Sequence, residues 1–424
     1  MKVIFLITFP PAYHFSSSTV PAHSWKNNKG RMLGIWREDW GHILAEEVKK
    51  SYPEIAFEVW RPDYRAEKEY VHVFNDGVVH RSFPARRKIT FYGLKLKWFY
   101  NSPDIIKALG KYIYPNGDYQ NTICHIPVDY SFLGHSILKK YGKKLTFIHT
   151  SHLNPAILLS RANTKNPCKW LHRQLIWRRY DRYLSNIQYL ALSSDRIDFF
   201  NTVTPDCRIY TFNYLWFDLS WSRNKINNEK ARDLLGLPTG IKVLLSSSRI
   251  VPEKQLDKLI GSLSKLRNSN YICLISGTGE EKYINYLQSL VNSLNLADKI
   301  VFTGYLDETL FLYYCAADLF VSTSLSEGGP VSVLKALALG VPVMATDTGI
   351  AAYILKKYRV GKVLDSQNSE EWSRIIDQFL AGNEIKSLDP VVFASEYDSK
   401  NAIEKLVDAY QDSIERFIEQ QDKS

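Results

Sequence analysis

The sequence predicts an α/β protein made of two domains, each with a doubly wound parallel sheet. With 424 residues, the chain is too long for one ordinary hydrophobic core and suits two domains of roughly 200 residues each. In its second half, short apolar segments typical of strands alternate with amphipathic segments typical of helices, and several strands end at glycine. Apolar residues make up 45% and charged residues 23% of the chain, which is normal for a folded soluble protein.

The second half supplies the clearest elements. The expected strands are residues 242–247, 271–276, 300–304, 319–322 and 342–346. The expected helices are residues 255–266, 281–294, 306–316 and 331–339. Repeated strand–helix units of this kind indicate a parallel sheet with helices on both faces.

The first half also begins with a strand-like segment. Residues 1–10 carry a charge and a short apolar stretch, as a signal peptide does. Their β-branched and aromatic residues, followed by Pro-Pro, fit a first buried strand better. Further strands are expected at residues 122–126 and 145–149, and apolar spacing predicts one amphipathic helix over residues 402–418.

The domain boundaries follow from these elements. The polar stretch 222–228 is the best candidate for a linker. We expect an N-terminal Rossmann-like domain over residues 1–220 and a ligand-binding domain over 221–390. A C-terminal helix over 391–424 is expected to pack back on the first domain.

The cysteines and the hydropathy exclude several classes of protein. The five cysteines are odd in number and scattered, without a C-x-x-C pair, so they indicate neither a disulfide framework nor a zinc site and fit a reducing cytoplasm. No apolar run approaches the roughly 18–20 residues that span a bilayer.

The net charge of +10 is distributed unevenly. Residues 1–220 hold 31 Lys and Arg against 18 Asp and Glu, whereas the remainder holds 23 against 26, so the halves carry +13 and −3. A basic first half suits an anionic lipid surface, a lipid diphosphate or a nucleic acid. The simpler interpretation is a solvated basic surface, and the chain lacks any recognised nucleic-acid motif.

Two cations follow the strand at residues 242–247. Arg249 and Lys254 stand five positions apart on a loop at the carboxyl end of a parallel strand, where such sheets bind ligands. Two fixed cations would offset the charge that grows on a diphosphate as its bond to a sugar breaks. The alternative is a solvated basic loop.

A glycine-containing turn at residues 326–330 opens a helix. Pro330 suits the first helical position, and Gly328 and Gly329 let a ligand approach bare backbone. The free N–H groups at Val331 and Ser332, together with the helix dipole, favour a phosphate. Glu327 is an acceptor-only group suited to sugar hydroxyls, although an ordinary turn with a capping acid explains it equally well.

Two further strand ends belong to this region. Gly277 begins a short Gly-Thr-Gly turn, which is more often a packing device than a phosphate cradle. Gly304 ends a strand whose backbone could pair with a flat base. Each is a weak signal alone, but their order and spacing together are specific.

In that order, residues 242–349 resemble the nucleotide-sugar domain of glycosyltransferase family four, the retaining GT-B enzymes. The residues that carry the resemblance are Arg249, Lys254, the turn 277–279, residues 301–304, 317–322, 327–330 and 340–343, and 345–347. The resemblance implies a GT-B fold, in which two doubly wound Rossmann-like domains face each other across a cleft. It also implies that Arg249, Lys254 and the amides after Gly329 hold the donor diphosphate and that Glu327 contacts the transferred sugar. Metal is usually dispensable in this family, and no cofactor beyond the nucleotide-sugar donor is expected.

The sequence departs from the family at Lys335, which stands eight positions after Glu327, where a second glutamate usually binds the ribose hydroxyls. An ammonium group donates hydrogen bonds but cannot accept them from a diol. Three explanations remain open: another group grips the ribose, the donor differs in its nucleotide, or the protein is an altered transferase with another role.

The resemblance also implies a histidine at the end of an N-domain strand. His149 matches best and His152 is the alternate, although a lone histidine at a strand end is more often structural. Gly30 and Gly34 are expected near the cleft. The tryptophans Trp25, Trp36 and Trp40 could stack on sugars but more often serve packing.

Two basic, aromatic segments, residues 87–98 and 165–183, suit a lipid headgroup zone, although packed elements with a basic solvent face would look the same. We therefore expect a cytoplasmic retaining glycosyltransferase, peripheral at the inner face of a membrane. It would move a sugar from a UDP- or GDP-sugar to a glycan or lipid-linked acceptor. The alternative is a GT-B protein that binds nucleotide-sugar or glycan without catalysis.

Overall fold

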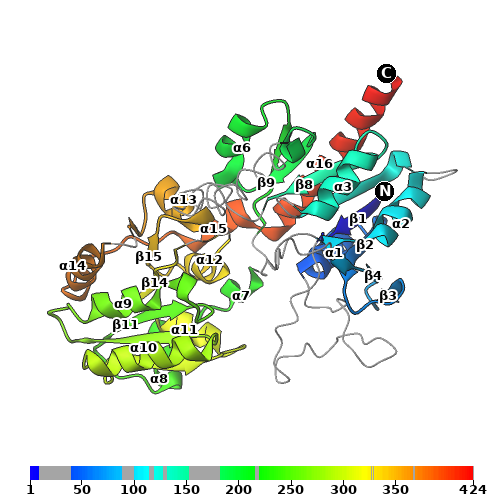
Figure 1. Cartoon of the computed structure of the whole chain (residues 1–424). Helices are drawn as coiled ribbons and strands as arrows, with labels where there is room; N and C mark the ends of the chain where they lie inside the picture. The colour runs from blue at the N-terminus through cyan, green and yellow to red at the C-terminus, as the bar shows by residue number, and fades with distance from the viewer. Residues whose placement is uncertain are drawn as a thin grey trace. The chain divides into compact units, whose positions relative to one another are not determined.

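The computed structural model describes residues 1–8, 40–87, 100–113, 119–127, 131–151, 182–214, 219–325, 327, 329–365 and 368–423. The chain divides into two compact units, one of residues 1–216 with 400–424 and one of residues 217–399. Each unit is built on its own sheet (Figure 1). None of the helices in the described ranges combines the length and apolarity that crossing a bilayer requires.

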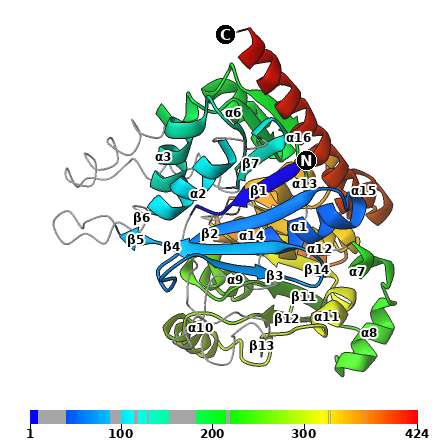
Figure 2. The same ribbon diagram turned by 90° about the vertical axis from the view of Figure 1, so that its right-hand side faces the viewer.

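The sheet of the first unit is eight-stranded and parallel except at one edge strand, which pairs antiparallel. Its strands, in spatial order, are β10 (Arg208–Thr211), β9 (Tyr189–Leu192), β8 (Thr146–Thr150), β7 (Thr122–Ile126), β1 (Lys2–Leu6), β2 (Ala56–Asp63), β4 (Val79–Pro84) and β3 (Tyr70–Val73). Figure 2 shows β1, β2, β4 and β3 side by side. A short antiparallel pair, β5 (Arg86–Arg87) and β6 (Tyr100–Asn101), follows β4.

Helices cover both faces of this sheet because successive residues of a strand point to opposite faces. Val3 and Phe5 pack with α1 and α16, whereas Ile4 and Leu6 pack with α2 and α3. The described helices of this unit are α1 (Trp40–Ser51), α2 (Pro103–Ile113), α3 (Phe132–Tyr141), α6 (Ile197–Val203) and α16 (Ser399–Asp422), with short 3₁₀ turns η1 (Tyr119–Asn121) and η2 (Ser194–Arg196).

The last helix belongs to the first unit although it follows the second in sequence. Leu406 and Tyr410 of α16 are buried with the residues of β1. The Tyr410 hydroxyl lies 2.7 Å from Nδ1 of His125 in β7, and the Tyr210 hydroxyl donates to Asp412 at 2.7 Å. The helix extends beyond the predicted 402–418 at both ends. The prediction was too short because the flanking residues are polar and carry no apolar periodicity.

The second unit has a six-stranded parallel sheet. Its strands, in spatial order, are β13 (Ile300–Gly304), β12 (Tyr271–Ser276), β11 (Lys242–Ser247), β14 (Leu319–Ser322), β15 (Val343–Thr346) and β16 (Lys362–Leu364). The order reverses at β11, so the carboxyl ends of β11 and β14 form the switch point where open sheets bind ligands.

The helices of the second unit mostly alternate with its strands, as predicted. They are α7 (Ser220–Arg223), α8 (Asn228–Leu235), α9 (Leu256–Leu263), α10 (Glu281–Ser293), α11 (Leu310–Ala316), α12 (Val331–Ala338), α13 (Gly349–Tyr358), α14 (Ser369–Leu380) and α15 (Pro390–Tyr397). A buried core of α9, α10 and α14 residues covers one sheet face, with Leu259 and Trp372 among its members.

Two helix starts differ from the prediction. The helix expected from residue 255 begins at Leu256, because Gln255 has φ +48 and follows the 3₁₀ turn η3 (Pro252–Lys254). The helix expected from residue 306 begins at Leu310. Turn-forming Asp307 accepts a long hydrogen bond from the Thr309 amide at 3.5 Å, and such Asp contacts compete with helix formation.

Candidate functional site

Two loops of the second unit meet beyond the carboxyl ends of β11 and β14. The Thr323 hydroxyl donates to the carbonyl of Lys254 at 2.9 Å, and the Leu325 amide donates to the carbonyl of Glu253 at 2.9 Å. These bonds fix the 3₁₀ turn that carries Lys254 against the loop that carries Glu327. The two sequence-predicted loops therefore form one surface.

Lys254 and Glu327 form an ion pair with each other. Nζ of Lys254 lies 2.5 Å from Oε1 of Glu327, and the two side chains are only 15% and 14% exposed. The sequence gives no sign of this pair, because the residues lie 73 positions apart. Removing one partner from a largely buried pair of this kind costs more than removing one from a surface ion pair, because it leaves a charge without its counterion.

Arg249 lies on a strand-like extension of β11. The Ser248 amide donates to the carbonyl of Ser276 at 3.0 Å, and the Ile250 amide donates to the carbonyl of Thr278 at 2.8 Å. The Gly277 amide in turn donates to the carbonyl of Gly304 at 2.8 Å. The loops after β11, β12 and β13 are thus hydrogen-bonded side by side. Arg249 itself is exposed, and no ion pair of its guanidinium occurs within the described ranges.

The glycine turn after β12 serves this close approach. Gly277 has φ +135, and a Cβ atom there would overlap the carbonyl oxygen of Ser248. A Cβ at Gly279 would overlap the carbonyl oxygen of Ile250. The Gly-Thr-Gly turn therefore serves packing: its glycines let the backbone of residues 248–250, which carries Arg249, lie directly against it.

Replacing Gly277 with alanine is expected to destabilise the second unit by about 3 kcal/mol or more, because a disfavoured φ adds to a backbone clash. Gly329→Ala is the matched control: no described atom lies within 4 Å of its Cβ position. It should change the unfolding free energy by no more than about 0.5 kcal/mol. Urea unfolding measures both, and equal effects would contradict the packing role.

The start of α12 lies at the same edge. Val331 is the first helical residue, so the expectation that Pro330 occupies the first helical position is wrong by one residue. Pro330 precedes the helix with ψ of 86°, outside the helical range. Proline brings no side-chain acceptor, so it caps none of the N–H groups in the first turn.

Lys335 lies one turn further along α12 and is partly buried. Burial lowers its pKa from the ordinary value of 10.5. Helical side chains lean toward the amino end of their helix, which favours an approach of the Lys335 ammonium to the first turn. The Tyr314 hydroxyl donates to the carbonyl of Ser332 at 3.0 Å and fixes that turn from α11.

These segments enclose one pocket of about 420 Å³. Among the predicted residues, its lining includes Arg249, Lys254, Gly277, Glu327, Gly329, Val331, Ser332 and Lys335. Gly304 does not line it but holds Gly277 through the hydrogen bond above, and Gly328 lies outside the described residues. The volume suits a ligand of nucleotide-sugar size.

The pocket also contains residues that the sequence analysis did not assign to the site. They are Ser247, Ser248, Ser276, Thr278, Tyr305, Leu306, Leu310, Tyr314 and Pro330. Tyr305 is 75% exposed although it is aromatic, which leaves its ring available for stacking. Six of these nine residues, Ser247 to Leu306, are the last residue of a strand or lie within two residues after it. Their position after β11, β12 and β13 is the signal that could have found them.

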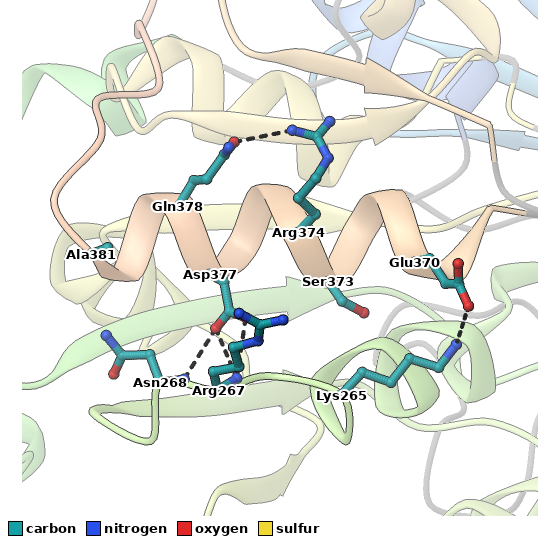
Figure 3. Close-up of a pocket in the computed structure, with 9 residues that line it drawn as sticks. All are labelled: Lys265, Arg267, Asn268, Glu370, Ser373, Arg374, Asp377, Gln378 and Ala381. Carbon is teal, nitrogen blue, oxygen red and sulfur yellow. Dashed lines mark hydrogen bonds and ion pairs between the residues drawn. The ribbon is translucent and has the colours of Figure 1, made fainter.

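A larger hollow of about 650 Å³ lies elsewhere on the second unit, between the loop leading into β12 and helix α14 (Figure 3). Both of its acidic side chains have partners within it: Asp377 accepts from the amides of Arg267 and Asn268, and Glu370 lies 3.9 Å from Lys265. The loop enters β12 at the amino edge of the sheet. Because parallel sheets bind ligands at the opposite edge, we assign the site to the smaller pocket.

His149 lies in β8 of the first unit, next to the last residue of the strand, and is 2% exposed. Its ring meets the Tyr183 ring edge-on at 5.6 Å. It lies near the backbone of Tyr189 without a well-formed hydrogen bond to the described residues. Burial lowers the pKa of His149 from 6.5 to about 3, so the imidazole is neutral near pH 7. The contact of His149 with the donor or the acceptor stays a prediction.

The lowered pKa of His149 makes the free energy of unfolding depend on pH. Unfolded His149 takes up a proton near pH 6.5, whereas the folded side chain does so only near pH 3, so the unfolding free energy falls as the pH drops below 6.5. The loss is at most about 1.4 kcal/mol per pH unit for this residue, and buried His80, whose pKa is also lowered, adds to it. His149→Phe should flatten the dependence in urea unfolding between pH 7.5 and 5. An unchanged slope would contradict the depressed pKa.

Several expectations for the first unit fall outside the described residues. They are Gly30, Gly34, Trp25, Trp36 and His152, together with nearly all of the basic segments 87–98 and 165–183. Trp40 is the first residue of α1.

Comparison with known proteins finds a family match for the part of the chain that holds the pocket. Residues 227–389 match the family described as glycosyl transferases group 1. The alpha-monoglucosyldiacylglycerol synthase of Streptococcus pneumoniae is 37% identical over 131 residues, which cover 30% of this chain and 29% of that protein. A GDP-mannose-dependent alpha-(1-6)-phosphatidylinositol monomannoside mannosyltransferase of Mycolicibacterium smegmatis is 30% identical over 147 residues, covering 33% and 38%. The chain spans less than half the length of the curated relatives it matches.

Solved structures extend the likeness to both units. The Anabaena protein Alr3699/HepE in complex with UDP aligns with a TM-score of 0.67 at 14% identity, over 97% of this chain and all of that one. At this identity the likeness concerns the fold alone. It confirms the predicted fold class, GT-B with two doubly wound Rossmann-like domains.

Proposed function

We propose, from the match of residues 227–389 to the family described as glycosyl transferases group 1, that the chain transfers a sugar from a nucleotide-sugar donor to a glycan or lipid-linked acceptor. One observation carries the proposal. Arg249 and Lys254 on the loop after β11, and Glu327 with the start of α12 on the loop after β14, converge on one pocket at the carboxyl edge of the sheet.

The charges of the pocket suit a diphosphate. Among the described residues that line it, the Lys, Arg, Asp and Glu side chains are Arg249, Lys254, Lys335 and Glu327, and the pair of Lys254 with Glu327 is neutral as a unit. Arg249 and Lys335 add two further cationic groups, which suits the two negative charges of a sugar-diphosphate linkage. Arg249 offers a planar fork of donors to phosphate oxygens. The amides at the start of α12 add uncharged donors.

The ion pair need not break when the donor binds. An ammonium group has three donors, so Lys254 can keep Glu327 and still donate to phosphate oxygens. A carboxylate has about four acceptor positions, so Glu327 can keep Lys254 and still accept from sugar hydroxyls. In this proposal the pair orients the two side chains at the bond that breaks, and the donors stabilise charge on the leaving diphosphate.

The chemistry of Lys335 restricts which part of the donor it can contact. As a donor-only group it can bind an oxygen of the ribose, the base or a phosphate, but it cannot replace a carboxylate that accepts from a ribose diol. Tyr305 offers an exposed ring at the same pocket for stacking of a base. We place a UDP- or GDP-sugar here. UDP occupies the structurally similar Anabaena protein, and the mycobacterial relative is named for GDP-mannose.

The acceptor proposal rests on charge and relatives. The basic first half, at +13, suits a lipid-linked acceptor presented on an anionic surface. One relative is named as the synthase of a diacylglycerol glycolipid, and another as a mannosyltransferase of phosphatidylinositol monomannoside. Binding to vesicles containing anionic lipid should weaken as salt rises; indifference to lipid charge would remove the membrane part of the proposal.

Retention of the anomeric configuration and independence of metal are the finer parts of the proposal. Both come from the family resemblance, and the cationic pocket is compatible with charge neutralisation by side chains alone. Transfer should persist in EDTA, and an α-linked donor should give an α-linked product by proton NMR.

The test is turnover across UDP-, GDP-, ADP- and dTDP-sugars with a glycolipid acceptor extract. We expect one nucleotide class to support transfer and its free diphosphate to inhibit competitively. A protein that binds a donor without transfer or hydrolysis would instead be a binding protein. Failure to bind any donor would retire the proposed function.

A further inference from the structure

A second cluster of chemically reactive side chains lies in the first unit, between α1 and the turn that joins β3 to β4. His42 and Glu46 stand four positions apart on α1 and so lie on one face of the helix. Asp76 projects from the turn, with its Oδ2 atom 2.9 Å from Nε2 of His42. One ligand atom from each of the three side chains lies within 4.8 Å of the other two.

Two of these side chains are held in place through their other polar atoms. Nδ1 of His42 lies 3.0 Å from Nε2 of His80 in β4, and His80 is 1% exposed. Oδ1 of Asp76 accepts from the Val78 amide at 2.9 Å. Metal-binding histidines and carboxylates usually have such outer partners, which fix the ring orientation and raise the basicity of the ligand.

The cluster is closed on one side and open on the other. The His42 side chain is fully buried, and its ring meets the Phe74 ring edge-on at 4.5 Å. The Asp76 and Glu46 side chains are 18% and 27% exposed. An ion can therefore enter from the carboxylate side and meet a preformed imidazole.

From this arrangement we propose that His42, Glu46 and Asp76 bind a divalent transition-metal ion, with Zn²⁺ as the best match. One imidazole nitrogen with two carboxylate oxygens is a donor set for Zn²⁺, whereas Mg²⁺ prefers oxygen ligands alone. Two ligands at about 2.0–2.2 Å from one Zn²⁺ are at most about 4.4 Å apart, so a small rotation of the partly exposed Glu46 closes the site.

Among the described residues, Lys50 is the cation whose ion pair with Glu46 competes with a metal. Its Nζ atom lies 3.8 Å from Glu46 but only 2.7 Å from Glu47, one residue further along the helix. Lys50 therefore keeps its shorter ion pair when Glu46 turns to the metal. The bound ion would join α1 to the β3–β4 hairpin, at the edge of the sheet where β3 has a neighbour on one side only.

The experiment titrates Zn²⁺ into the untagged, EDTA-treated and desalted full chain by calorimetry, with Mg²⁺ as the second ion. We expect one equivalent of Zn²⁺ to bind and to raise the Tm, and Mg²⁺ at the same concentration to do neither. Glu46→Gln and Asp76→Asn should each weaken Zn²⁺ binding about tenfold or more. We substitute the two carboxylate ligands because replacing the buried His42 could unfold the protein. Glu47→Gln, on the same helix, is the matched control and should bind like the wild type.

Circular dichroism and the Tm without metal confirm that each variant is folded. Absence of saturable Zn²⁺ binding would overturn the proposal and leave the cluster as a hydrogen-bonded relay of Asp76, His42 and His80. Equal affinities in all three variants would do the same, because they would locate the ion elsewhere.

Discussion

Replacing Arg249 with alanine is expected to lower kcat/KM for sugar transfer by about 100- to 1000-fold. This is the loss seen when one donor to developing charge is removed from a preorganised site. Arg249 is exposed and makes no ion pair in the parts of the chain that the structure describes, so its removal leaves no buried charge behind. The fold should therefore survive, and the loss should report on chemistry. Steady-state kinetics with the active donor measures it.

Two variants sharpen this expectation. Arg249→Lys keeps the charge but loses the planar fork of donors, and should recover only part of the activity. Arg267→Ala removes another exposed arginine of the same unit, at the amino edge of the sheet (Figure 3), and should leave kcat/KM unchanged. Equal losses in Arg249→Ala and Arg267→Ala would mean that general charge, not the pocket, governs the reaction.

In a double-mutant cycle, substitutions of Lys254 and Glu327 should have strongly non-additive effects on nucleoside diphosphate binding. Lys254→Ala alone leaves the Glu327 carboxylate without its counterion in a pocket that receives a diphosphate, so nucleoside diphosphate binding should fall about 100-fold. Adding Glu327→Gln removes the stranded charge and should recover part of that affinity without restoring transfer. A coupling free energy of about 1–3 kcal/mol is expected for residues in direct contact.

Glu327→Gln alone should distinguish contacts to the sugar from contacts to the nucleoside diphosphate. Affinity for the free nucleoside diphosphate should hardly change, whereas turnover of the sugar donor should fall, because Glu327 is assigned to sugar hydroxyls. Asp347 and Lys356 form a pair of the same 2.5 Å length, with side chains 60% and 56% exposed, and provide the control cycle. Exposed pairs couple by less than about 1 kcal/mol. Equal coupling in both pairs would contradict a functional role for the first.

Local patterns were sufficient to predict five of the six described strands of the second unit and the four helices between them, but not β16 or the helices before β11 and after β15. Each expected strand, such as residues 300–304, is apolar and ends near glycine or a polar loop, and the observed strands match these segments closely. Arg249, Lys254 and the start of α12 could be assigned to one edge because carboxyl ends of parallel strands share an edge. The pairing of Lys254 with Glu327 could not, because contact between loops 73 residues apart depends on the strand order.

The first unit was harder to predict. Strand β3 has four residues of alternating exposure, and β4 contains His80, Arg81 and Ser82 among its six residues. Neither has the apolar run that marks a buried strand. The cluster of His42, Glu46 and Asp76 has no recognisable sequence motif, because a helix and a turn 30 residues away supply it. Its detection required the structure.

The central claim is that the nucleotide-sugar donor binds at the carboxyl edge of the second unit's sheet. Hydrogen–deuterium exchange with and without the active nucleotide diphosphate locates that site directly. We expect slower exchange in residues 248–254, 277–279 and 329–335, with no change in residues 265–268 and 373–381. Protection confined to the latter segments, or no protection at saturating ligand, would contradict the claim.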